Sequence, residues 1–244
     1  MIYGDFVLPV GSGPFPGICK FHGLPGGADQ VSGFATDLAE AGFAVLTFDF
    51  RGFRRSDGIF SLPGQLKDAS NAVTHLLNSG YAIVDWLGVY AASYGGPVAI
   101  ISAAQDERID AVCLRAPVYD LPWFVNHPMV PAEMKRLIAE GSDVVHGLTE
   151  ETMSQMHDQM LKDAAAYDLP GLISQISSRP LMITTGLLDR GIDSGGVRRL
   201  FEAAKEPKEF HLVKEADHVL SNPEAYQETS RLVVEWFTRI CPYL

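Results

Sequence analysis

Short apolar segments alternate with amphipathic segments along most of this 244-residue chain. The apolar segments are typical of strands that are buried on both faces, whereas the amphipathic segments repeat their apolar residues at helical spacing. An alternation of this kind is the pattern of a mostly parallel sheet that is covered by helices on both faces. The sequence therefore predicts the α/β fold class, with about seven strands.

The expected elements follow from this alternation and from the glycines and prolines between segments. Strands are predicted at residues 3–8, 17–22, 43–48, 111–114, 181–185 and 209–213, with one more that begins at Trp86. Helices are predicted over residues 29–41 (with Val31 on the apolar face) and 197–204, near Pro63, after Ser93 and from Asn222-Pro223. In such a fold, ligands bind at the carboxyl ends of the strands.

The alternation stops between about residues 118 and 179, where aromatic residues, prolines and methionines replace the strand pattern. We expect a single domain over residues 1–244, with this segment inserted as a helical cap. Met153, Met156 and Met160 share one helical face there. Such a flexible apolar face suits either a lid over an apolar ligand or ordinary packing of the helix on the domain.

The segment WLGVYAASYGG, from Trp86 to Gly96, predicts a strand, a tight turn that carries Ser93, and then a helix. Ala91 and Gly95 lie two positions to either side of this serine, where such a turn requires small residues. The turn exposes the serine hydroxyl above the sheet, which makes Ser93 a candidate nucleophile. The same short pattern also occurs by chance, so the assignment depends on a matching base and acid.

A serine hydroxyl becomes a nucleophile when a histidine takes its proton and a carboxylate orients that histidine. His218 follows the strand predicted at 209–213, whereas the histidines weighed against it lie inside a predicted helix, a strand or the cap. Asp189 follows the strand predicted at 181–185 and is the preferred acid. Asp193 and Asp217 remain as alternatives for this role.

Acyl transfer also requires hydrogen-bond donors for the oxygen that becomes negative in the tetrahedral intermediate. The backbone N–H of Tyr94 directly follows the candidate nucleophile, at the positive end of the next helix. The loop HGLPGG, which begins at His22, offers the N–H of Leu24 as the second donor. His22 and Gly23 are expected to shape this loop, with a ligand role for His22 as the alternative.

Several motifs, in a fixed order, resemble the α/β-hydrolase superfamily. They are PFPGICKFHG, FDFRGFRRSDG, the segment around Ser93, GLLDRGID and EADH, and they cover most of the chain outside the predicted cap. The resemblance is to compact esterases related to cinnamoyl and feruloyl esterases, dienelactone hydrolases and serine aminopeptidase-like hydrolases. Two positions depart from the pattern, since Ala91 and Arg54 stand where these proteins commonly carry glycine.

This resemblance implies an α/β-hydrolase fold and a serine esterase that works through an acyl-enzyme, with Ser93, Asp189 and His218 in the family's order. A small-molecule ester is the expected partner, with an aromatic or medium-chain acyl group. A peptidase, thioesterase or lactonase with the same three residues is the alternative, as is a non-catalytic ligand-binding protein. The candidate substrate-binding residues are the apolar cap residues Trp123, Phe124, Met156 and Met160.

Composition argues against several other classes of function. The net charge of −11 disfavours nucleic acid and anionic membranes as partners, and no apolar run is long enough to span a membrane. The N-terminal residues do not read as a signal peptide, so a cytoplasmic location is expected. Neither a dinucleotide fingerprint nor a metal-ligand cluster is found, so no cofactor or metal is expected, and no oligomeric state is predicted.

Cys19, Cys113 and Cys241 are expected to be free thiols, the first two buried and Cys241 able to be exposed.

Overall fold

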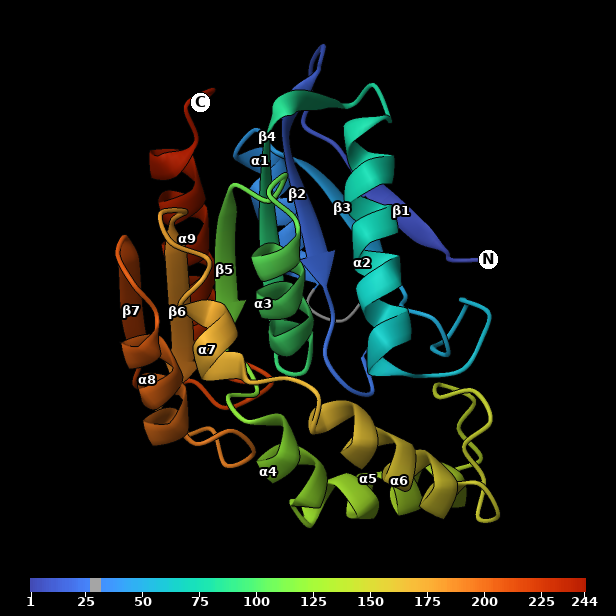
Figure 1. Ribbon diagram of the computed structural model, residues 1–244. Coiled ribbons are helices and arrows are strands. Elements are labelled where there is room, and N and C mark those ends of the chain that lie inside the picture. Colours follow the sequence, from blue (N-terminus) through green and yellow to red (C-terminus); the bar gives the residue numbers. More distant parts are fainter. Residues whose placement is uncertain (27–31) are drawn as a thin grey trace.

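The computed structural model describes residues 1–26 and 32–244, and these residues form a seven-stranded sheet in the order β1-β3-β2-β4-β5-β6-β7 (Figure 1). The edge strand β1 pairs antiparallel with β3, and all the other pairs are parallel. The strands are β1 (Gly4–Val7), β2 (Phe15–Phe21), β3 (Ala44–Phe48), β4 (Ala82–Ala92), β5 (Ala111–Arg115), β6 (Leu181–Gly186) and β7 (Lys208–Val213). The prediction of a mostly parallel seven-stranded α/β fold is confirmed.

Two layers of helices cover the faces of this sheet (Figure 1). One face packs against four helices: α2 (Leu62–Leu77), α3 (Gly95–Gln105), α7 (Leu169–Ile173) and α8 (Ser194–Ala203). The other face packs against α1 (Ser32–Glu40) and α9 (Pro223–Ile240). Strands β3, β5 and β6 are buried along their whole lengths, which explains why they appear in the sequence as continuous apolar runs.

The helix boundaries follow ordinary capping chemistry. The side chain of Ser61 accepts a hydrogen bond from the N–H of Gly64 at the start of α2 (3.2 Å). Asn222 accepts one from the N–H of Glu224 (2.9 Å) at the start of α9, the position that the Asn-Pro pair predicts. Helix α1 begins at Ser32, and Val31, which the sequence places on its apolar face, lies outside the described residues.

Strand β4 begins at Ala82, four residues before the predicted start at Trp86. Its first residue pairs with Phe15 of β2 across an irregularity in the register, and Val84 and Asp85 are exposed. The sequence does not indicate a strand there because this segment projects beyond the buried part of the sheet.

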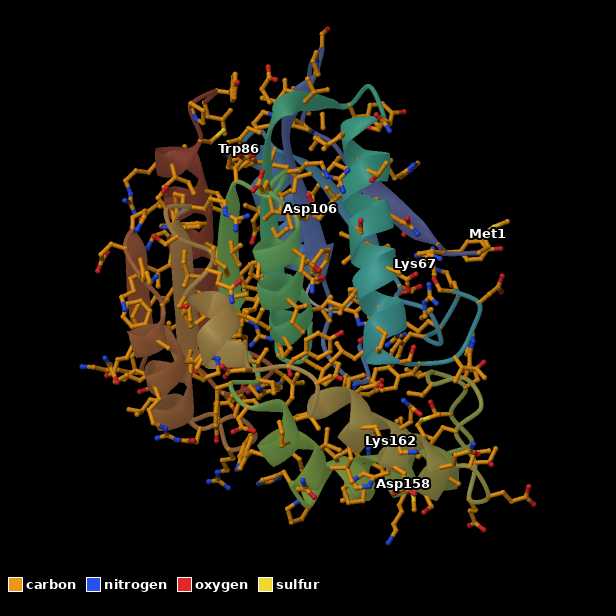
Figure 2. All side chains as sticks on the ribbon, viewed as in Figure 1. Met1, Lys67, Trp86, Asp106, Asp158 and Lys162 are labelled. Atoms are coloured by element: carbon orange, nitrogen blue, oxygen red, sulfur yellow. The ribbon has the colours of Figure 1, made fainter. Side chains whose placement is uncertain are left out.

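The predicted cap segment forms α4 (Leu121–Asn126), α5 (Met129–Ala139), α6 (Met153–Ala164) and α7. Figure 1 shows α4, α5 and α6 together beyond the carboxyl ends of the strands, whereas α7 packs against α3 and α8. Figure 2 labels Asp158 and Lys162, which are exposed on α6, while Met160 of the same helix is buried. Helices α4, α5 and α6 thus overlie the sheet edge, and the bounds of the cap at about residues 118–179 stay a prediction.

All three cysteines are free and buried. The sequence allows Cys241 to be exposed, but only 4% of this residue is accessible, because it packs with the end of α9 in the core behind the sheet. Burial raises the pKa of each thiol above its ordinary value. Over the described residues, we find no helix with both the length and the apolar character needed to cross a membrane.

Candidate active site

Ser93 occupies the tight turn between β4 and α3, with a φ of 54°. A non-glycine residue in this left-handed region is strained and must be held there by its surroundings. The N–H of Ser93 donates to the carbonyl of Arg115 (3.0 Å), and its carbonyl accepts from the N–H groups of Gly96 (3.0 Å) and Val118 (3.1 Å). These three bonds hold the serine at the carboxyl edge of the sheet.

Two glycines allow the loop after β2 to approach this turn. A Cβ atom at Gly95 would lie 2.7 Å from the carbonyl oxygens of Phe21 and His22, and one at Gly23 would lie 2.8 Å from the Cβ of Ser93. Any side chain at these positions would push the two segments apart. Ala91, by contrast, is fully buried within β4, where a methyl group fits.

The three side chains assigned as nucleophile, base and acid lie in one chain of hydrogen bonds. Ser93 Oγ is 3.0 Å from His218 Nε2, and His218 Nδ1 is 2.7 Å from Asp189 Oδ2. A carboxylate can only accept, so Nδ1 carries the proton and Nε2 accepts from the serine hydroxyl. This is the arrangement in which a histidine can remove the serine proton.

Asp189 is held rigidly behind the histidine. Its residue is 8% exposed, and its Oδ1 accepts hydrogen bonds from the N–H groups of Gly191 (2.9 Å) and Ile192 (2.8 Å). The two alternative acids have other partners, since Asp193 caps α8 and Asp217 bonds to Ser221. The structure therefore brings Asp189 to His218, whereas Asp193 and Asp217 serve local turns.

The two backbone donors named as an oxyanion hole lie on opposite segments beside Ser93. Tyr94 follows Ser93 at the start of α3, and Leu24 lines the same cleft as Ser93. Neither N–H has an acceptor among the described residues. Their role as oxyanion donors stays a prediction, and it is supported by the fact that, within the described part of the chain, both N–H groups are free to donate to a ligand.

His22 has a structural position in the loop that carries Leu24. Its Nε2 accepts a hydrogen bond from the N–H of Phe50 (2.9 Å), so its Nδ1 carries the proton and donates to the carbonyl of Gly23 (2.7 Å). Its ring also packs edge-on against Phe50 and Phe53. Both ring nitrogens are thus used within the protein, which matches the expectation that His22 shapes the loop.

We expect His22 to make the folded protein sensitive to mild acid. Burial lowers the pKa of His22 from 6.5 to about 4, because the charged imidazolium is poorly solvated there. Between these pH values the unfolded chain binds a proton that the folded chain excludes, so the free energy of unfolding falls as the pH falls. From pH 7 to pH 5 this contribution amounts to about 2 kcal/mol.

Urea denaturation at both pH values measures this effect. His22→Gln retains an acceptor for the N–H of Phe50 but cannot titrate, so the variant should be less stable at pH 7 and lose less stability on acidification. The same loss of stability in wild type and variant would contradict the assignment to His22.

A cleft of about 380 Å³ contains Ser93 and His218. Its other lining residues are Gly23, Leu24, Pro25, Ala92, Arg115, Glu133, Arg136 and Val219. Leu24, Pro25 and Glu133 also line a second, almost wholly apolar pocket of about 80 Å³, so the two spaces adjoin. This pocket is completed by Phe53, Phe60, Phe124, Met129, Val130, Met134, Leu137, Val145, Leu148, Met156 and Met160.

Three of the four predicted substrate-binding residues, Phe124, Met156 and Met160, line the apolar pocket. Trp123 does not line it, because its ring stacks on Tyr119 at a centroid distance of 4.6 Å. Phe53 and Phe60 were not predicted from the sequence, although both lie in a loop that follows a strand. Arg115 was not predicted either, although a charged residue at the end of an apolar run could have pointed to it. Within residues 1–26 and 32–244, no three histidine, cysteine or acidic side chains are grouped to hold a metal ion.

Comparison with known proteins places these features among α/β hydrolases. The Hydrolase_4 family model, described as serine aminopeptidase, S33, matches residues 14–169. The chain is 26% identical over 218 residues to the Uncharacterized protein YfhR of Escherichia coli O157:H7, covering 87% of this chain and 67% of that protein.

Solved structures share the fold at low sequence identity. Est1E of Butyrivibrio proteoclasticus, with ferulic acid bound, gives a TM-score of 0.76 at 15% identity and covers 98% of this chain and 94% of its own. The monoacylglycerol lipase of Paleococcus ferrophilus gives 0.71 at 20% identity, with 98% and 99% covered. These likenesses establish the α/β-hydrolase fold.

Proposed function

Because the chain belongs to the Hydrolase_4 family and has the α/β-hydrolase fold, we propose that it is a serine hydrolase that cleaves carboxylic esters. The observation that carries this proposal is the hydrogen-bonded chain from Ser93 through His218 to Asp189. The serine lies on a strained turn at the carboxyl edge of the sheet, inside a cleft of about 380 Å³. A reactive hydroxyl in an open cleft is what acyl transfer requires.

In this mechanism His218 Nε2 takes the proton of Ser93 Oγ as that oxygen attacks the ester carbonyl. Asp189 keeps the proton on Nδ1 and stabilises the imidazolium that forms. The N–H groups of Leu24 and Tyr94 donate to the negative oxygen of the tetrahedral intermediate. The imidazolium then protonates the leaving alcohol, and water, activated by the same histidine, releases the acid from the acyl-enzyme.

The apolar pocket supports an acyl group that is aromatic or of medium chain length. Its lining is aromatic and aliphatic except for Glu133, so burial of a hydrocarbon group would be favourable while a charged group would be desolvated. Ferulic acid in Est1E is an aromatic acid bound in the same fold, which is consistent with this choice.

An active-site-directed fluorophosphonate tests the proposed chemistry directly. We expect the probe to label the wild-type protein on Ser93, to abolish the activity measured with p-nitrophenyl butyrate, and not to label Ser93→Ala. Folded wild-type protein that neither reacts with the probe nor cleaves the ester would instead favour a non-catalytic ligand-binding protein.

The pocket makes a separate prediction about acyl chain length. Met156→Trp should fill part of the pocket and lower kcat/KM for p-nitrophenyl octanoate by about tenfold, with little change for the acetate, since one or two buried methylenes already change binding severalfold. Met153→Trp is the matched control, because Met153 is half-buried on the same helix but does not line the pocket. An equal effect on both esters would count against the pocket as the acyl site.

A further inference from the structure

Arg115 is a buried cation in the candidate active site. It ends the apolar strand β5, its residue is 6% exposed, and it lines the cleft that contains Ser93 and His218. Arginine is rarely buried to this extent without an anionic partner, because the cost of removing its charge from water is high. The role of Arg115 can therefore be inferred from the hydrogen-bond and ion-pair partners of its guanidinium.

The guanidinium has only neutral partners among the described residues. Its Nη1 donates to the backbone carbonyl of His218 (2.7 Å), and its Nε is buried without a hydrogen-bond partner. The hydroxyl of Tyr90 is also buried; burial raises its pKa, and the charge of Arg115 and a hydrogen bond with that residue oppose the rise. No described aspartate or glutamate lies within ion-pair distance of Arg115.

The other charged side chains of the cleft lining, Glu133 and Arg136, form an ion pair with each other. Arg136 binds Glu133 at 2.6 Å and Glu140 at 2.6 Å, so Glu133 enters the cleft already paired. Arg115 is then the cation of the cleft lining whose charge is not matched, in a chain with a net charge of −11. A positive site inside an acidic protein is selective for an anion that can reach it.

We propose that Arg115 binds a carboxylate on the leaving alcohol of the ester, so that the substrates are apolar acyl esters of small hydroxy acids. This inference rests on the proposed esterase function. Guanidinium groups bind carboxylates through charge-assisted hydrogen bonds, and the Nη groups of Arg115 supply donors for them.

The position of Arg115 places the carboxylate on the leaving-group side. His218 must protonate the leaving oxygen, so the alcohol lies next to its loop, and Arg115 holds the carbonyl of that same residue. The acyl group then occupies the apolar pocket on the other side of Leu24 and Pro25. In the reaction the ester C–O bond breaks, the Ser93 Oγ–carbonyl bond forms, and the His218 proton goes to the oxygen of the departing hydroxy acid.

A matched pair of substrates tests the proposal. O-Octanoyl glycolate and O-octanoyl glycolamide have the same shape and release the same octanoate, but only the first carries a negative charge. We expect wild type to have a KM for the glycolate ester that is lower by about tenfold or more, the range of a charge-assisted hydrogen bond. Equal KM values for the two esters would overturn the proposal.

Arg115→Gln removes the charge but keeps a donor for the carbonyl of His218. It should raise KM for the glycolate ester by about tenfold relative to KM for the glycolamide ester, so that the preference for the charged ester is lost, while Arg115→Lys recovers part of the preference. If Arg115 only positions the His218 loop, kcat falls equally for both esters, which would overturn the proposal. Arg231→Gln, which removes an exposed arginine paired with Glu235, is the control for net charge.

Binding to Ser93→Ala separates this inference from the proposed function. Calorimetry should show tighter binding of the glycolate ester than of the glycolamide ester to this variant, and Arg115→Gln in the same background should remove the difference. If wild type cleaves neither ester but this difference is found, the esterase function is wrong and the carboxylate site stands. If binding shows no difference, the carboxylate site is wrong, whatever the turnover.

Discussion

Ser93→Ala should lower kcat/KM for p-nitrophenyl butyrate by about 10⁴-fold or more, the loss found when a serine hydrolase is deprived of its nucleophile. The variant has no side-chain atom that can bond to the acyl carbon. The cleft, the apolar pocket and the amides of Leu24 and Tyr94 remain, so a small rate above that of water should persist. Initial rates at saturating and sub-saturating ester, with the protein shown to be free of wild type, measure the loss.

The interpretation of this loss requires that the variant folds. The three hydrogen bonds that hold residue 93 in the left-handed region involve its backbone, so alanine keeps them. Ser102→Ala is a matched control, because Ser102 is a buried serine of α3 whose hydroxyl has no hydrogen-bond partner among the residues that the structure describes. We expect this control to retain full activity. Ser93→Ala protein with more than a tenth of wild-type activity would rule out the assigned nucleophile.

Periodicity predicted the sheet because strands β3, β5 and β6 are buried along their whole lengths. Such strands are mostly apolar, as in AVLTF of β3 and LMITTG of β6, and they can be recognised without knowledge of the neighbouring strands. The first residues of β4 were not predicted, because their pairing partner, Phe15, is distant in sequence and their side chains include the exposed Val84.

The members of the site that follow strands were accessible to sequence reasoning, because parallel strands bring their carboxyl ends to one edge. The sequence could not show which of two neighbouring residues lines the pocket. Trp123 and Phe124 are adjacent on α4, yet Phe124 packs near Tyr94 with ring centroids 5.6 Å apart, while Trp123 stacks on Tyr119. Which of two successive residues faces the pocket depends on how the helix is docked, and docking is set by contacts that are remote in sequence.

Asp189→Asn should lower kcat by about 10⁴-fold at neutral pH while leaving the fold intact, as happens when the acid of such a triad becomes an amide. The geometry at Asp189 gives the reason. Its Oδ1 accepts from the N–H groups of Gly191 and Ile192, so an asparagine would turn its carbonyl oxygen toward those two donors. Its NH₂ group would then face His218 Nδ1, which lies 2.7 Å from the present Oδ2.

An NH₂ group in that place can only donate, so Nδ1 of His218 must become the acceptor and the ring proton must move to Nε2. Nε2 would then donate to Ser93 Oγ and could not remove its proton. The fall in kcat would therefore come from the wrong tautomer of His218 and not from a displaced side chain. Asp193→Asn is the control, because Asp193 caps α8 through the same side-chain type and an asparagine caps a helix about equally well. Steady-state kinetics and urea denaturation of both variants distinguish the two effects: a similar fall in kcat for Asp193→Asn, or a large loss of stability in Asp189→Asn, would attribute the defect to the loop before α8 instead of to the histidine.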